Sequence, residues 1–189
     1  MFMSNSRSCR LFASIGFGLF ALWALPVVAA EGEGVYHIGR QATDADIQAW
    51  NIDISPTGEG LPPGQGTVSG GAAVYAAKCA MCHGPTGIEG PMTKLVGGQG
   101  TLTNSHPVKT VGSYWPYATT LYDYIHRAMP LTAPQSLTSD EVYSVVAWLL
   151  FQNRIIPEHT VIDAKTLPGI RMPNRDGFVS GPPPDVPRP

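Results

Sequence analysis

Charged residues and cysteines are both scarce in this 189-residue chain. Asp, Glu, Lys and Arg make up 14% of it, the formal net charge is −2, and no run of basic residues is present, so we expect no nucleic-acid partner. The sequence has three cysteines, no internal repeat and no glycine-rich phosphate-binding loop. By contrast it contains 21 glycines and 18 prolines, which predicts a small core held in long, turn-rich connections.

The first thirty residues have the pattern of a secretory signal peptide. Arg7 and Arg10 precede the apolar run "LFASIGFGLFALWALPVVAA", whose small terminal residues suit cleavage after Ala30. An uncleaved membrane anchor is the alternative, because about 20 apolar residues can span a bilayer. Either way, we expect the rest of the chain to lie outside the cytoplasm, in the periplasm, with no membrane insertion after cleavage.

Once Cys9 is removed with the signal peptide, the only cysteines left are Cys79 and Cys82, in "AAKCAMCHGPTG". A disulfide or redox dithiol is one interpretation, although redox C-x-x-C pairs usually follow a strand of a thioredoxin-like unit. A zinc site would need two further ligands, and no second C-x-x-C or H-x-x-x-H is present. His83 completes C-x-x-C-H, the attachment motif of c-type haem, in which two thiols add to the porphyrin vinyl groups and the imidazole binds iron. We therefore predict one covalently bound haem c.

The segments around this motif predict helices. "SGGAAVYAAKCAMCH" has a candidate N-cap at Ser69, and "TTLYDYIHRAM" has an apolar face consisting of Leu121, Tyr124, Ile125 and Ala128. The strongest helix pattern is "SDEVYSVVAWLLFQN". There Thr138 and Glu141 form a capping box, Leu137 and Val142 can form a hydrophobic staple, and apolar residues recur at helical spacing: Val142, Val145, Val146, Leu149 and Leu150.

These helices and the haem motif predict an all-α fold, a small class I cytochrome c bundle around one haem. We assign residues 1–30 to the signal peptide, 31–66 to an N-terminal arm, 67–155 to the cytochrome c domain, and 156–189 to an extended C-terminal arm with a proline-rich end.

Several residues could supply the second axial ligand of the iron. His106 and His159 lie beside turn residues and should be exposed, while His126 projects away from the apolar face of its helix and is expected at the surface. Met81 lies between the two cysteines, and Met92 is in the loop on the His83 side. None of these is a favoured ligand.

Two Met-Pro pairs remain, in "HRAMPL" and "GIRMPN". Met129 lies between two predicted helices, where its thioether can reach over the haem and Pro130 stiffens the loop. Met172 lies in a stretch without periodicity, so we expect it to pack on the domain or on a partner. We therefore predict Met129 as the sixth ligand. His/Met ligation would raise the reduction potential of the iron and make the site an electron carrier, since both axial positions are filled. With an open or displaceable sixth site, the chain would instead be a haem enzyme or a ligand sensor.

Aromatic residues cluster in the segment Tyr114-Trp115-Pro116-Tyr117. Packing at the haem edge is the simpler interpretation, and a hydrogen bond from Trp115 or Tyr117 to a haem propionate is the alternative. Trp148 should be a core residue that packs near Tyr75.

Four stretches resemble a more specific family, the SoxD-type cytochrome c subunits that pair with molybdenum-cofactor dehydrogenases of the sulfite-oxidase type: "IGRQATDADIQAWNIDISPTGEGLPPGQGTVSGG", "VGSYWPYATTLYDYIHRAMP", "QSLTSDEVYSVVAWLLFQNRII" and "TLPGIRMPNRDGF". The resemblance covers roughly residues 37–178. It implies a subunit that is not an enzyme by itself. Such a subunit accepts electrons released by oxidation of sulfite or sulfane sulfur, and passes them to another cytochrome c or a terminal oxidase.

The resemblance also implies roles for individual residues. Cys79 and Cys82 would bind the haem, His83 and Met129 would be its axial ligands, and the carbonyl of Pro91 would orient the imidazole. With a single C-x-x-C-H motif, the chain resembles the single-haem members of the family. No molybdenum-binding motif is present. A soluble shuttle without a fixed partner is the alternative, but the long segments 35–66 and 154–178 favour a partner that they could wrap.

Overall fold

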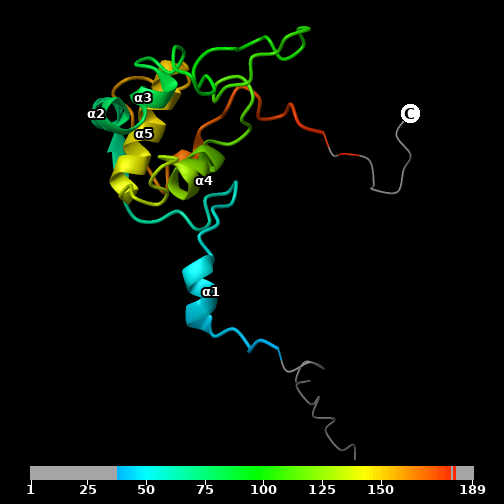
Figure 1. Ribbon diagram of the computed structural model, residues 1–189. Helices are drawn as coiled ribbons and strands as arrows, with labels where there is room; N and C mark the ends of the chain where they lie inside the picture. The colour runs from blue at the N-terminus through cyan, green and yellow to red at the C-terminus, as the bar shows by residue number, and fades with distance from the viewer. Residues whose placement is uncertain (1–37, 180, 182–189) are drawn as a thin grey trace, which may run out of the picture. The chain divides into compact units, whose positions relative to one another are not determined.

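The computed structural model describes residues 38–179 and 181 (Figure 1), so the predicted signal peptide, Cys9 and His37 lie outside the described residues. Its regular elements all belong to the second of two compact units, Ala42–Pro189. In chain order these are α1 (Asp44–Trp50), β1 (Gln65–Thr67), α2 (Val68–Lys78), α3 (Ala80–His83), α4 (Ala118–Ala128), α5 (Ser139–Gln152), β2 (Val161–Asp163) and the 3-10 helix η1 (Leu167–Gly169). The prediction of an all-α fold is confirmed in that the fold is mostly helical, and a two-stranded sheet is present besides. No helix in the described range is long and apolar enough to cross a membrane.

Helix α5 is the centre of the core and contacts α2, α4 and both strands. Its predicted apolar positions are all buried, and so are three of its other residues: Tyr143, Ala147 and Trp148. Tyr75 of α2 stacks on Trp148 with ring centroids 3.8 Å apart, as expected. The two helices approach closely at Gly71, where a Cβ would lie 1.9 Å from the carbonyl oxygen of Ser144.

The predicted start of α5 is confirmed in detail. The Thr138 hydroxyl accepts a hydrogen bond from the Glu141 N–H at 3.3 Å, and the Glu141 carboxylate accepts one from the Thr138 N–H at 2.8 Å. Leu137 and Val142 are both buried. Glu141 also pairs with Lys78 at 3.1 Å, which ties the end of α2 to the start of α5.

Helix α2 begins two residues earlier than its predicted cap implies, so the assignment of Ser69 as N-cap is wrong. Thr67 is the N-cap, with its hydroxyl accepting a hydrogen bond from the Gly70 N–H at 3.1 Å. The reason is the short strand β1, which holds Thr67 in extended geometry until the helix starts.

The buried face of α4 is rotated from the predicted one. Leu121 and Ile125 are buried as expected, but Tyr124 is 48% exposed and Tyr122 is fully buried, because its ring packs 4.5 Å from that of Tyr143. One turn later, His126 is half-buried and its Nδ1 is a buried atom without a hydrogen-bond partner. The expectation of a surface role for His126 is therefore wrong.

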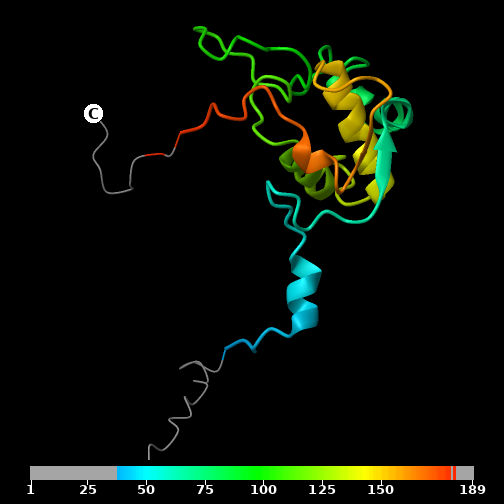
Figure 2. The same cartoon turned by 180° about the vertical axis from the view of Figure 1, so that it is seen from behind.

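The C-terminal segment is not the loose arm that we expected. β2 pairs antiparallel with β1 (Figure 2). Gly66 lies opposite Ile162, and the segment buries four apolar side chains: Ile156, Ile162, Leu167 and Met172. Residues 156–172 therefore contribute to the core instead of forming an extended arm. Its apolar residues are separated by turns and each packs individually, so they leave no helical or alternating pattern in the sequence.

Part of the predicted N-terminal arm also packs on the domain. Ile54 is buried and its N–H donates to the Asp123 carboxylate of α4 at 3.2 Å, while the Tyr143 hydroxyl donates to the Pro62 carbonyl at 2.9 Å. Helix α1, by contrast, has a complete capping box but buries none of its residues.

Candidate functional site

The C-x-x-C-H motif lies where α2 ends and the short helix α3 begins. Cys79 caps both helices, and its carbonyl oxygen accepts hydrogen bonds from the N–H groups of Cys82 at 3.1 Å and His83 at 3.0 Å. The two cysteines are thus one turn apart with the imidazole next to them, as predicted. Both are free thiols and half-buried, and no group of three or more His, Cys, Asp or Glu in the described residues could hold a metal ion.

The environment of Cys79 disfavours a redox dithiol. Burial is the main cause that raises the pKa of the Cys79 thiol to about 11; Lys78 lowers it and Cys82 raises it further. Redox-active C-x-x-C pairs work through a thiolate and have a lowered pKa. A thiol that stays protonated suits a structural attachment point better than a redox centre.

The backbone fixes the orientation of the His83 ring. Its Nδ1 lies 2.9 Å from the carbonyl oxygen of Thr93, and Nε2 is the nitrogen left to bind a metal. Most metal-bound histidines are held in this way through the other ring nitrogen. We expected the carbonyl of Pro91 to orient the ring, and this expectation is wrong. The carbonyl oxygen beside Nδ1 belongs to Thr93, two residues later in the loop.

A glycine-rich loop folds back beneath α3. Gly84 ends α3 with a φ of 80°, and its carbonyl accepts a hydrogen bond from the buried Tyr75 hydroxyl at 2.9 Å. A Cβ on Gly90 would lie 2.2 Å from the carbonyl oxygen of Cys82, so only glycine fits there. The Met92 N–H donates a hydrogen bond to the same Cys82 carbonyl at 3.0 Å, and this hydrogen bond brings the loop to the His83 ring.

The two Met-Pro pairs lie in different environments. Met129 is the C-cap of α4 and is half-buried at the edge of the core, in the connection to α5. Met172 is 1% exposed and belongs to the core itself. We expected Met172 to pack on the domain or on a partner, and it packs in the core of the domain itself. Nothing in the structure tests the ligand assignment of Met129, which stays a prediction.

The other candidate ligands have less suitable positions. His106 and His159 are exposed, as predicted. Met81 is 85% exposed and Met92 about half exposed. The sequence interpretation wrongly placed His126 at the surface. Its spacing of four residues from Tyr122, which is a core residue, is the signal that could have indicated its burial.

The aromatic segment before α4 is half-buried. Trp115 packs edge-on against Tyr124 with ring centroids 5.5 Å apart. Tyr117 is the N-cap residue of α4, and the guanidinium carbon of Arg175 lies 4.2 Å from its ring centroid. The packing interpretation of Trp115 is compatible with this arrangement. A hydrogen bond to a propionate stays a prediction for both residues.

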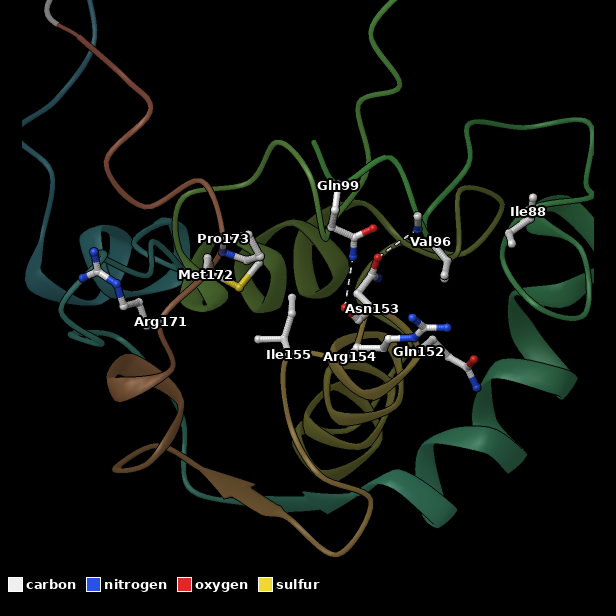
Figure 3. Close-up of a pocket in the computed structure, with 11 residues that line it drawn as sticks. Ile88, Val96, Gln99, Gln152, Asn153, Arg154, Ile155, Arg171, Met172 and Pro173 are labelled. Atoms are coloured by element: carbon white, nitrogen blue, oxygen red, sulfur yellow. Dashed lines mark hydrogen bonds between the residues drawn. The ribbon is translucent and has the colours of Figure 1, made fainter. Parts of the chain in front are cut away.

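A cavity of about 800 Å³ opens at the C-terminal end of α5 (Figure 3). Asn153 holds its wall together, since its side-chain oxygen accepts a hydrogen bond from the Gly97 N–H and its backbone carbonyl accepts one from the Gln99 amide, both at 3.0 Å. Met172 also lines the cavity. None of the seven residues that the sequence predicts for the haem site lines this cavity. Asn153 is a buried polar residue whose role sequence reasoning missed.

The donor groups at α3 fit a covalently bound haem c. Two free thiols one turn apart can form the thioether links, and His83 has Nδ1 engaged and Nε2 available. Half-buried apolar side chains that pack on the core edge could line the porphyrin: Cys79, Leu95, Trp115 and Met129.

Comparisons with known proteins agree with this geometry. The family model "Cytochrome C oxidase, cbb3-type, subunit III" matches residues 66–149, which include the whole C-x-x-C-H motif. No protein of curated function matches the chain. The solved structure of the sulfane dehydrogenase SoxCD from Paracoccus pantotrophus contains a chain with 42% sequence identity and a TM-score of 0.71. The match covers 76% of this chain and 71% of that one.

Proposed function

Because the chain belongs to the SoxD-type family of cytochromes c, we propose that it is the electron-transfer subunit of a dehydrogenase complex. Its donor is a subunit with a molybdenum cofactor that oxidises sulfite or sulfane sulfur, and its acceptor is another cytochrome c or a terminal oxidase. The similarity to a chain of a sulfane dehydrogenase, at 42% identity over most of both chains, supports this choice of partner. Substrate oxidation then takes place on the partner, and this subunit is not an enzyme by itself.

The cytochrome c family implies covalent haem c, and the single C-x-x-C-H supports one haem per chain. When bound, the haem takes up and releases one electron at its iron. Cys79 and Cys82 would hold it by thioether links, and His83 would supply a ligand to its iron. The Thr93 carbonyl holds the ring of His83 in place.

The position of Met129 is the observation that favours electron transfer over catalysis. It lies half-buried in the connection between α4 and the capped start of α5, where a weak neutral ligand would be held in place by the flanking helices. As a ligand of the iron, the Met129 thioether would exclude substrates from it, and His/Met ligation would raise the reduction potential. We propose that the chain works in the periplasm after cleavage of residues 1–30.

Purification from the native periplasm tests this proposal. We expect the chain to co-purify with a subunit that contains molybdenum, to begin at Glu31, and to show haem reduction when sulfite or a persulfide is added. A chain that elutes alone, without molybdenum, and whose haem stays oxidised with both substrates would contradict the proposed partner. Rapid carbon monoxide binding to the reduced protein would instead favour the enzyme or sensor interpretation.

A further inference from the structure

Asn153 joins the C-terminal end of α5 to the loop that contains Leu95 and Gly97. It is the C-cap residue of α5 and is 3% exposed. Its side-chain oxygen accepts a hydrogen bond from the Gly97 N–H at 3.0 Å (Figure 3), and its side-chain nitrogen donates to the Leu95 carbonyl at 3.1 Å. The same nitrogen donates to the Leu149 carbonyl of α5 at 2.9 Å. One buried amide therefore satisfies polar groups of the loop and of the helix together.

This loop also contains the carbonyl that orients His83. Leu95 follows Thr93 by two residues, and the Thr93 carbonyl oxygen lies 2.9 Å from Nδ1 of His83. Among the described residues, Thr93 has no other hydrogen-bond partner, so the anchored residues on either side of it determine where its carbonyl lies. On one side the Met92 N–H donates to the Cys82 carbonyl at 3.0 Å. On the other side the anchor is Leu95.

Asn153 is the side chain that connects this anchor to the core. Backbone groups of neighbouring loops also bind Leu95, and the Thr110 hydroxyl donates to the Gly97 carbonyl. These partners lie in loops themselves, whereas Asn153 ends the helix at the centre of the core. An amide can accept from one backbone group and donate to another at the same time, while a leucine of similar size can do neither. The loop therefore depends on the amide of Asn153 for its attachment to α5.

We propose that Asn153 is a positioning residue for the haem ligand His83. Through Leu95 and Gly97 it holds the Thr93 carbonyl against Nδ1, and so fixes the orientation of the imidazole from the end of α5. In metal sites, a hydrogen bond at the second ring nitrogen of a histidine fixes the ring and raises its basicity as a ligand. The inference rests on haem attachment at the C-x-x-C-H motif and is independent of the identity of the partner subunit.

Two measurements on the holoprotein test this role: NMR of the reduced form and redox titration. In Asn153→Leu, the Nδ1 proton of His83 should exchange with water on the order of tenfold faster, because losing a buried hydrogen bond favours local opening by about this factor. The reduction potential should rise, because a weaker hydrogen bond at Nδ1 makes the imidazole a poorer donor to the oxidised iron. Thr138→Ala is the matched control. It removes a cap at the other end of α5 and should match the wild type in both measurements.

Wild-type proton exchange at His83 together with a wild-type potential in Asn153→Leu would overturn the proposal, even where the variant is less stable. Faster exchange confined to the Gly97 amide would also overturn it, because Asn153 would then support the loop without acting on the haem ligand. Where Asn153→Leu yields no holoprotein, Asn153→Ser, which also lacks the amide, decides the question by the same two measurements. A wild-type result in that variant would count against the proposal.

Discussion

At the scale of single residues, two methionines with nearly identical neighbours have different environments. Each methionine has an arginine one or two residues before it and a proline directly after it. Met129 is nevertheless half-buried at the end of α4, whereas Met172 is a core residue. Only Met129 has a side chain at the edge of the core, in the connection where the second axial ligand is expected. Met172 is almost fully buried, and part of it lines the cavity at the C-terminal end of α5.

We predict opposite consequences for substitutions at these two positions. Met129→Leu should abolish the methionine–iron charge-transfer band of the oxidised protein and allow carbon monoxide to bind, with a small effect on folding. Met172→Ala should keep the band and lower the free energy of unfolding by about 2–5 kcal/mol, as buried methionines do. Absorption spectra and urea titrations measure both effects.

Met172→Leu, which conserves volume, is the control and should cost less than about 1.5 kcal/mol. Loss of the band in Met172→Leu, with retention in Met129→Leu, would reverse the ligand assignment.

At the scale of elements, α5 depends on one residue for two contacts. Glu141 completes the capping box with Thr138 and pairs with Lys78 at the end of α2, the helix that leads into the haem motif. The cap hydrogen bond from the Thr138 backbone is the largest cause that lowers the pKa of Glu141, followed by Lys78. A carboxyl with a lowered pKa stabilises the fold above its unfolded pKa, and this contribution disappears as the pH falls through the folded pKa.

Glu141→Ala should therefore lower the free energy of unfolding at pH 7 by about 1 kcal/mol and make its decrease between pH 5 and 3 less steep. Glu141→Gln can still form the capping box, so it should lose less stability at pH 7 but show the same flattened pH dependence. Urea titrations across this pH range measure the effect. A variant that follows the wild-type pH curve would show that Glu141 does not contribute in this way.

At the scale of the whole molecule, the C-terminal segment completes the cytochrome fold instead of extending from it. β2 pairs with β1 directly before α2 and contacts α5, and η1 contacts α4. The helix that bears the haem motif is therefore supported from a part of the chain about a hundred residues later in the sequence. Contacts of this kind also bring Arg175 to Tyr117.

Two neighbouring residues of β2 test this role. Ile162 is fully buried and Val161 is 47% exposed, so Ile162→Ala should lower the free energy of unfolding by about 2–5 kcal/mol, while Val161→Ala should change it by about 0.5 kcal/mol or less. Thermal or urea unfolding of the holoproteins gives both values. Equal effects of the two substitutions would indicate that the segment is a loosely attached arm.

Much of the site could be predicted from the residues alone, because its chemistry is local. The C-x-x-C-H motif contains its own thiols and imidazole, the α5 capping box joins residues three apart, and the helical spacing of Val142, Val146 and Leu149 identifies a buried face. Each of these depends on neighbours within a turn or two of helix. The sequence by itself therefore determined that the haem motif lies at the end of a helix and where the main helices lie in the chain.

The tertiary structure decided everything that depends on distant contacts. It replaced Pro91 by Thr93 as the partner of His83, rotated the buried face of α4 toward Tyr143, and brought Met172 into the core. Such contacts join residues that lie in loops or far apart in the chain, where backbone hydrogen bonds and individual packing leave no periodic pattern. Only the folded chain brings their atoms together, and for that reason no local reading of the sequence could assign them.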